Sequence, residues 1–201
     1  MAGKILVSTA YLPPIEYFSL ILKADEVIIE REENYVKQSY RNRCYVLTAQ
    51  GRQPLSVPVY LGSQHKTPVK DIRIDYSKRW QQVHLRTMTA SYSSSPYFEY
   101  YFEILEKVIS VKNDFLLELN TKLTETVSGI LKINTKFSYS TTFAPPVETV
   151  NDFRYKISPK VKSQFSTKEY LQVFNIGRGF VRELSILDLI FNMGPEAVDY
   201  L

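Results

Sequence analysis

The chain has 201 residues, of which 44% are hydrophobic and 23% are charged. This length and composition are enough to bury one core, so they exclude a disordered or fibrous chain and predict a single domain over residues 1–201. Lys and Arg total 25 against 21 Asp and Glu, a net charge of +4. So small an excess excludes a protein that coats a polyanion, and we expect no nucleic-acid partner.

Cysteine and histidine usage narrows the chemistry further. Cys44 is the only cysteine, so neither an intrachain disulfide nor a cysteine-rich zinc site can form. The two histidines, His65 and His84, exclude a histidine-rich centre, and we expect no metal site. The N-terminal apolar run is shorter than a signal peptide, and no stretch approaches the roughly 18 to 20 apolar residues of a membrane span. We therefore expect no cleavable signal, no membrane span and a cytoplasmic location.

The first thirty residues have the pattern of a βαβ unit. Residues Lys4–Thr9 form an apolar, β-branched run that predicts a buried strand. Pro13 and Pro14 can open a helix, in which apolar residues recur at helical spacing up to Leu22. Val27–Glu30 predicts a second strand. A strand, a helix and a strand within about thirty residues make the two strands parallel.

The next segment predicts a β-hairpin. Cys44–Thr48 and Leu55–Tyr60 are strand-like runs joined by a turn at Gln50-Gly51. Pro58 should place the second strand near an edge or a bulge. Val69–Asp75 predicts another short strand. The sheet as a whole is then mixed.

Three helices are predicted to follow. The first covers Lys78–Tyr92, and the second has Ser95 as its N-cap and Pro96 as its first helical residue. The third covers Asp114–Lys132 and carries one apolar stripe. We therefore expect an α/β fold: a mixed sheet with an N-terminal βαβ unit and a hairpin, packed by about four to five helices.

The last third of the chain alternates between regular and irregular segments. Lys136–Thr142 predicts a strand, and residues 143–167, which contain three prolines and no sustained period, predict a loop. Gly177-Arg178-Gly179 is a lone GxG, which predicts a turn more strongly than a nucleotide site. Glu183–Asn192 predicts a final helix, followed by one last turn that begins at Pro195. Asp188 lies among the apolar residues of this helix, and we expect its carboxylate to hydrogen-bond a neighbouring loop.

His84 is the first candidate for catalysis. On a helix of about 100° per residue, His84 lies in the middle of an arc that also holds Trp80, Thr87 and Met88. A histidine that faces a cleft there could act as a general base. The alternative is a core histidine hydrogen-bonded to the backbone, which is the more common case.

Charged residues after the second strand are candidates for ligand binding. Lys37, Arg41 and Arg43 lie within seven residues, and an extended segment would present all three on one side, ready for a phosphate or a carboxylate. A charged strand edge in solvent is an equal alternative. Glu32 could face the same cleft as a catalytic carboxylate, because ligands gather at the carboxyl ends of strands in open α/β sheets. The alternative is a salt-bridge cluster with Arg31 and Lys37.

Several segments, in this order, resemble the WbqC-like family, whose members occur in bacterial O-antigen and capsule biosynthesis loci. Residues Tyr11–Phe18 are similar to the family's YLPWIGYF stretch, Lys37–Arg43 to its KRSWQNRN segment and Leu55–Val59 to its LTVPV strand. Trp80, His84–Thr87, Tyr92 and Pro96–Phe98 resemble its helical W, HLRT, Y and PYF pattern. Leu184–Glu196 matches its LSILDLLFNxGPE signature, which is the most specific piece.

The resemblance implies a transferase-type enzyme that modifies a sugar in surface-polysaccharide synthesis. Its ligand would be an anionic small molecule such as a nucleotide-linked sugar, and no cofactor is identified. Through the matching motifs, Tyr11 and Asn42 join the three basic residues as candidates for ligand binding.

The first motif departs from the family's pattern. Typical members begin it with His-Gln-Pro-Asn, whereas this chain has Val7-Ser8-Thr9-Ala10. A histidine that might have served catalysis is therefore missing. The alternative function is a non-catalytic, degenerate member that binds or scaffolds polysaccharide enzymes.

Overall fold

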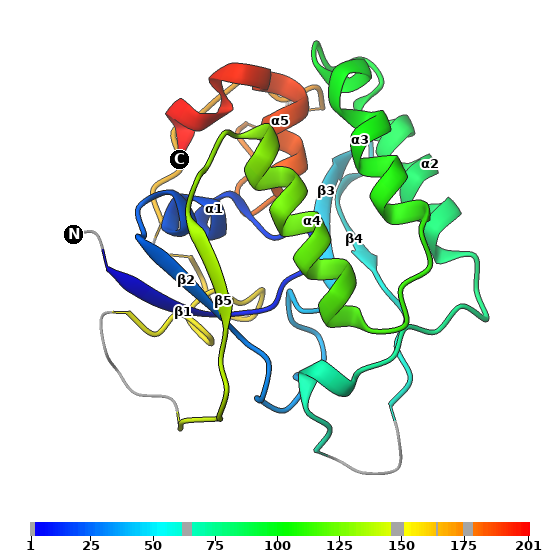
Figure 1. The fold of residues 1–201 in the computed structure, drawn as a ribbon. Coiled ribbons are helices and arrows are strands. Elements are labelled where there is room, and N and C mark those ends of the chain that lie inside the picture. Colours follow the sequence, from blue (N-terminus) through cyan, green and yellow to red (C-terminus); the bar gives the residue numbers. More distant parts are fainter. Residues whose placement is uncertain (1–2, 62–65, 146–150, 164, 175–178) are drawn as a thin grey trace.

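Three parallel strands form the main sheet of the computed structural model, which describes residues 3–61, 66–145, 151–163, 165–174 and 179–201. The strands lie in the order β1 (Lys4–Ser8), β2 (Glu26–Glu30) and β5 (Lys136–Tyr139) (Figure 1). Helix α1 (Ile15–Leu22) connects β1 to β2. The predicted βαβ unit is therefore confirmed, and so is the strand predicted near residue 136.

Alternating burial explains how this sheet holds its core. Ile5 and Val7 of β1, and Val27 and Ile29 of β2, are buried, because successive side chains of a strand point to opposite faces. Residues at helical spacing on α1, including the fully buried Phe18, belong to the same apolar cluster. The apolar residues that recur at helical spacing therefore form the face of α1 that packs against the sheet.

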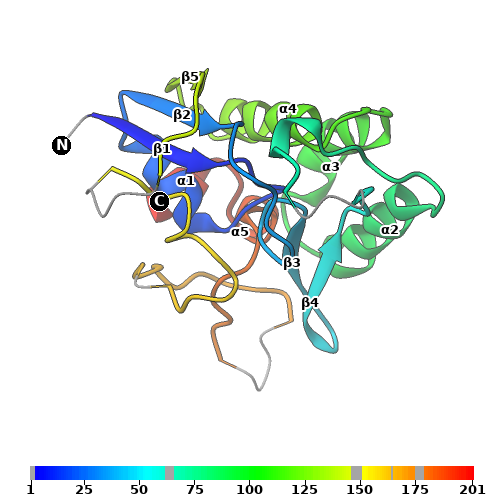
Figure 2. The ribbon, with the colours of Figure 1, turned by 90° about the horizontal axis from the view of Figure 1, so that it is seen from below.

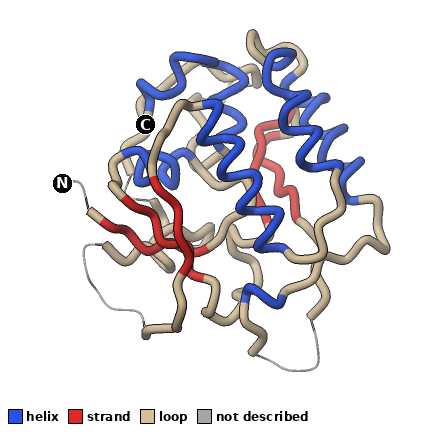
Figure 3. The backbone as a smooth tube through the Cα atoms, in the orientation of Figure 1, coloured by secondary structure: helices blue, strands red, loops and turns tan. Residues whose placement is uncertain are grey.

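The predicted hairpin is present as β3 (Arg43–Thr48) and β4 (Gly51–Ser56), which pair antiparallel as a second, separate sheet (Figure 3). The second strand begins earlier and ends earlier than the predicted range, which started at Leu55. Gly51 has a φ of 109°, a conformation that glycine adopts without steric cost. The chain can therefore reverse direction between Thr48 and Gly51 and begin to pair β4 with β3 directly after the turn.

The strand predicted at Val69–Asp75 is wrong over its first half. Val69–Asp71 forms the 3-10 turn η1, in which the Asp71 amide donates to the Pro68 carbonyl at 3.0 Å. Only isolated bridges follow, from Arg73 to Phe115 and from Ile74 to Val59. Pro68 lies directly before the turn and favours it, since proline fixes a φ that suits a turn.

The remaining helices pack against one another and against the hairpin. They are α2 (Trp80–Tyr92), α3 (Phe98–Ser110), α4 (Leu116–Ile130), α5 (Ile186–Met193) and the 3-10 helix η2 (Gly194–Tyr200). Helix α3 contacts α2, α4 and α5, and α2 contacts β3. The α/β fold with four to five helices is confirmed. None of the helices that the structure describes is long and apolar enough to cross a membrane.

The predicted start of α3 is wrong by a few residues. Ser95 does not cap the helix: its carbonyl accepts from the Phe98 amide at 3.2 Å in a preceding turn, and its buried Oγ has no partner among the described residues. The serine-proline signal therefore marks the turn that leads into the helix.

A long loop connects β5 to α5, as predicted for residues 143–167. Where the structure describes this loop, its backbone pairs briefly with β1: the Phe153 amide donates to the Leu6 carbonyl at 2.8 Å. The yellow part of the loop passes beside α1 in Figure 2. His65, Gly177 and Arg178 lie outside the described residues.

Candidate functional site

A buried ion pair lies at the carboxyl ends of β1 and β2. Arg41 donates from Nε to Glu33 Oε1 at 2.9 Å and from Nη2 to Glu33 Oε2 at 2.6 Å. Both side chains are almost fully buried, at 5% and 0% exposure. The same Nη2 donates to the Oγ of Ser8, the last residue of β1, at 2.7 Å. One guanidinium therefore joins the end of β1 to the segment that follows β2.

A second buried pair lies beside the first. Arg154 donates from Nε and Nη2 to the two oxygens of Asp152, at 3.0 and 2.7 Å, and from Nη1 to Glu30 Oε2 at 2.9 Å. Hydrogen bonding to Asp152 and the charge of Glu30 raise the pKa of Arg154. The side chain of Arg154 thus fixes the loop after β5 to the last residue of β2.

Together the two pairs place three carboxylates against two guanidinium groups inside the protein. Burying charge costs several kcal/mol per ion unless partners compensate it. The carboxyl ends of parallel strands are also where ligands bind in open α/β sheets. This cluster therefore marks the candidate functional site.

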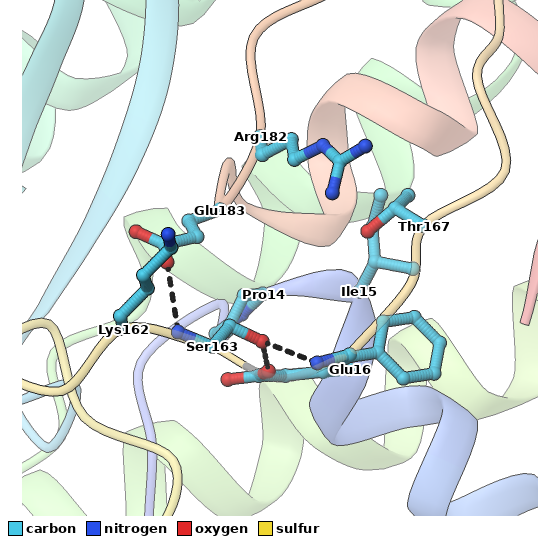
Figure 4. Close-up of a pocket in the computed structure, with 9 residues that line it drawn as sticks. Pro14, Ile15, Glu16, Lys162, Ser163, Thr167, Arg182 and Glu183 are labelled. Carbon is cyan, nitrogen blue, oxygen red and sulfur yellow. Dashed lines mark hydrogen bonds between the residues drawn. The ribbon is translucent and has the colours of Figure 1, made fainter.

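A depression leads away from the cluster along α1. It starts as a narrow recess at the end of β1, continues as a groove of about 470 Å³ and ends in a pocket of about 80 Å³ (Figure 4). Phe153 and Ile157 line both the recess and the groove. Glu16, Lys162, Ser163 and Phe165 line both the groove and the pocket. The full lining of the recess is Ser8, Thr9, Ala10, Tyr17, Tyr40, Arg41, Phe153, Arg154 and Ile157.

Glu16 is the carboxylate that lines both the groove and the pocket, and Glu183 lines the pocket as well. Glu16 lies in the first turn of α1 and accepts a hydrogen bond from Ser163 Oγ, as Figure 4 shows. The Ser163 amide donates to Glu183 Oε1 at 3.1 Å. Partial burial raises the pKa of Glu16, although the bond from Ser163 opposes the rise. A carboxyl group with a raised pKa beside a groove is a stronger base than an ordinary carboxylate and is a candidate for proton transfer.

His84 and Tyr11, two of the predicted site residues, meet in the core. The His84 ring is 2% exposed, its Nδ1 is 2.8 Å from the Tyr11 hydroxyl, and it also hydrogen-bonds the Ser56 backbone. Burial lowers the pKa of His84 to about 4, so the ring is neutral at pH 7. Trp80 packs against it, with ring centroids 5.1 Å apart. His84 lines neither the recess, the groove nor the pocket.

The predicted cationic face is wrong, because the chain is not extended there. Residues 37–41 form turns, and Gln38 has a φ of 56°. Lys37 is exposed, Arg41 is buried in its pair with Glu33, and Arg43 is only partly buried. The three cations therefore do not share one side.

Asn42 and Glu32 have structural partners. Asn42 Nδ2 donates to the Val57 carbonyl at 2.9 Å and so fixes the end of the hairpin. Glu32 accepts from Lys70 Nζ at 2.6 Å and lies 3.3 Å from Arg31 Nε. The hydrogen bond from Lys70 lowers the pKa of Glu32. The salt-bridge alternative is present, with Lys70 in the place expected for Lys37. A role of Asn42 or Glu32 toward a ligand stays a prediction.

The residues that carry the site were largely missed by the sequence reasoning. Nothing in the sequence distinguishes Glu33 from its acidic neighbours Glu30 and Glu32 at the end of the second strand. Asp152 and Arg154 lie in a segment without periodicity, and no local pattern connects them with β2. The one available signal is the acid and the base that flank Phe153, in a stretch that also carries Lys156, Lys160 and Lys162.

The fold and site define an α/β protein with a buried charge cluster at the carboxyl edge of its parallel sheet. Residues 9–164 match the model of the WbqC-like protein family, and the chain belongs to that family. The matched range includes Arg41, Glu33 and Arg154 and ends before the segment Leu184–Glu196.

One relative is similar over almost the whole length. It is a protein of Mycobacterium tuberculosis (strain ATCC 25618 / H37Rv) named "Uncharacterized protein Rv1507c", 28% identical over 222 residues, which cover 98% of this chain and 96% of the relative. No solved structure matches the chain.

Proposed function

We propose that this WbqC-like protein is a transferase that modifies a sugar in bacterial surface-polysaccharide synthesis, with its substrates in the depression along α1. The observation that carries the proposal is the pair of buried ion pairs at the head of that depression. Neither pair is needed to cover apolar surface, and well-packed apolar residues are often at least as stable as buried ions. Charge kept in such a position is therefore typical of a functional site.

Basic side chains along the depression support an anionic substrate such as a nucleotide-linked sugar. Lys162 lines both the groove and the pocket, Lys156 lines the groove and Arg182 lines the pocket. Positive charge around a cleft attracts phosphate by long-range electrostatics. The excess of positive charge lies in the groove, where Lys156 and Lys162 stand against Glu16, whereas Glu16 and Glu183 balance Lys162 and Arg182 in the pocket.

Within this proposal, Glu16 accepts the proton of the acceptor hydroxyl while that oxygen forms a bond to the anomeric carbon of the donor sugar and the nucleoside diphosphate leaves. The sequence predicts His84 or Glu32 for catalysis, but both have partners elsewhere, whereas Glu16 lines the groove. A general base contributes roughly 10²- to 10⁴-fold to a rate. The Ser163 hydroxyl would orient the Glu16 carboxylate by its hydrogen bond. When the substrate hydroxyl binds, it would take the place of the Ser163 hydroxyl at that carboxylate.

The test begins with a thermal-shift screen of the protein against uridine- and thymidine-diphosphate sugars. A ligand at a hundred times its Kd adds about 2.7 kcal/mol to the free energy of unfolding. For any sugar that stabilises the protein, product formation with candidate acceptors is then followed by mass spectrometry. Glu16→Gln should keep the thermal shift and lose turnover at least a hundredfold. Glu103→Gln, on the exposed face of α3 and paired only with Lys107, is the control and should lose neither.

The alternative function is a non-catalytic partner of polysaccharide enzymes. It is favoured by the missing histidine of the first motif, where Val7 stands, and by the full pairing of Arg41. Stabilisation by a sugar nucleotide without product from any acceptor would support this alternative. No stabilisation by any member of the panel would contradict the proposed substrate class.

A further inference from the structure

The groove between α1 and the loop after β5 has an apolar lining that packs against the core on one side and stays partly open to solvent on the other. Leu20 of α1 contributes one wall, and Phe153, Ile157, Val161 and Phe165 contribute the other. Val161 remains 50% exposed and Leu20 is only partly buried. Apolar side chains gathered in an open concavity typically mark a binding site.

Lysines surround this apolar lining. Lys156 and Lys162 are exposed and line the groove, and Lys23 Nζ lies 5.7 Å from the centre of the Phe165 ring. The single carboxylate in the lining, Glu16, already accepts from Ser163. An apolar floor with a basic rim is complementary to an amphiphile whose polar end is an anion.

We infer that the groove binds the hydrophobic chain of a lipid phosphate, with the phosphate against Lys156 and Lys162. The volume of about 470 Å³ lies within the roughly 300–1,000 Å³ of small-molecule sites. A chain in this groove would contact Phe153 and Ile157, which also line the recess, itself only about 10 Å³ and too small to admit the chain. The lipid phosphate then carries the sugar whose hydroxyl is the acceptor of the proposed transferase, so this inference rests on the proposed function.

A chain-length series of alkyl phosphates tests the groove without requiring turnover. Binding of hexyl, octyl and decyl phosphate to the full chain is measured by titration calorimetry, each below its micelle concentration. Each added methylene should strengthen binding about fourfold, so decyl phosphate should bind roughly 15-fold more tightly than octyl phosphate. Decanol and inorganic phosphate should each bind at least tenfold more weakly than decyl phosphate.

Matched variants locate the binding. Val161→Asp should weaken decyl phosphate at least tenfold, whereas Val83→Asp, at a similarly exposed valine of α2, should leave it unchanged. Lys162→Gln should weaken decyl phosphate without affecting decanol. Lys107→Gln, on α3, is its control.

Three results would overturn the inference: no binding of decyl phosphate, equal binding by the Val161→Asp and Val83→Asp variants, or equal binding of decanol and decyl phosphate. In a fourth outcome, the protein binds phosphatidylglycerol vesicles and Val161→Asp does not weaken that binding. This result would overturn the groove assignment and indicate a membrane surface as the ligand. If alkyl phosphates fail but sugar nucleotides are turned over, only the groove assignment falls. If alkyl phosphates bind as expected but no sugar is ever transferred, only the transferase proposal falls.

Discussion

At the scale of single residues, His84 links the core to the site. Its partner Tyr11 follows directly on the β1–α1 turn whose residues Ser8, Thr9 and Ala10 line the recess. The Tyr11 amide donates to the Tyr40 carbonyl at 2.8 Å, next to Arg41. A histidine that holds this tyrosine therefore helps to position the head of the depression.

Replacing His84 should lower stability more than it lowers specific activity. His84→Leu leaves the buried Tyr11 hydroxyl without its partner, which costs about 1 to 3 kcal/mol. Urea unfolding measures this loss. Adding Tyr11→Phe should cost less than the sum of the two single changes, because the unpaired hydroxyl is gone. A His84→Leu protein of unchanged stability that has lost activity a hundredfold would restore the catalytic interpretation.

The pH dependence of stability gives a second measurement of His84. Its pKa is about 4 in the folded chain, against 6.5 for an ordinary histidine. Between these two pH values the histidine is therefore protonated in the unfolded chain and neutral in the folded chain. The free energy of unfolding should therefore be unaffected above pH 6.5 and should fall as the pH drops toward 4, by up to about 3 kcal/mol. His84→Gln should remove this part of the loss when urea unfolding is compared at pH 7 and pH 4.5.

Asp188 holds a loop, as the sequence predicts. Its Oδ2 accepts from the Tyr170 hydroxyl at 2.7 Å and from Gln172 Nε2 at 2.9 Å. Asp188→Ala should therefore lower the free energy of unfolding by roughly 1 to 3 kcal/mol, measured by urea unfolding. Unchanged unfolding combined with lost turnover would contradict this structural role.

Asp188 should also make the protein less stable at higher pH. Burial raises the pKa of Asp188 to about 6 from 3.8, so its contribution to stability is complete below pH 3.8 and is lost as the pH rises through 6. This trend is opposite to that of His84. A comparison of Asp188→Asn with the parent chain at pH 5 and pH 7.5 should show the variant losing less stability over that interval.

At the scale of elements, the junction between α5 and η2 depends on Gly194. It has a φ of 54°, and a Cβ placed there would lie 2.4 Å from a ring carbon of Tyr97. The Tyr97 amide donates to the Phe191 carbonyl at 3.0 Å, which holds the start of α3 against α5. The close approach of these two helices therefore requires a residue without a side chain.

Gly194→Ala should lower the free energy of unfolding by about 2 kcal/mol or more, through backbone strain and the displaced ring. The matched control is Gly129→Ala in α4, where nothing lies within 4 Å of an added Cβ. That change should stabilise the protein by about 0.5 to 1 kcal/mol, since alanine favours a helix over glycine. Equal melting temperatures for the two variants would contradict the packing argument.

At the scale of the whole molecule, the ion pairs connect segments far apart in the chain. Arg41 joins the end of β1 to Glu33, and Arg154 brings the loop after β5 to Glu30. Because removing one partner leaves the other charge buried alone, Arg41→Met should cost about 3 to 5 kcal/mol. The double variant Arg41→Met with Glu33→Leu should recover most of that loss in urea unfolding while losing the candidate site. A double variant no more stable than the single one would show that the pair matters through its other bonds, such as the one to Ser8.

The sequence by itself determined those features that depend on neighbouring residues. The spacing of apolar residues predicted β1, α1, β2 and the later helices, because helix and strand spacing decide which side chains can share a core. The turn residues at Gln50-Gly51 predicted the hairpin. Family motifs identified the WbqC-like family, which the match over residues 9–164 shows. The 3-10 turn at Val69 was missed because a β-branched run does not reveal whether a strand partner will lie beside it.

Tertiary structure alone decided where the charges meet. Arg41 and Glu33 are eight residues apart, but Glu30 and Arg154 are separated by 124, and no local spacing encodes such a pair. The turn at residues 37–41 directs Arg41 into the protein, and the pairing of Phe153 with Leu6 brings Arg154 to the same place. Burial of these charges beside the hollow that Glu16 lines defines the candidate site. The electrostatic energy of each charge depends on its surroundings in space and not on its neighbours in sequence.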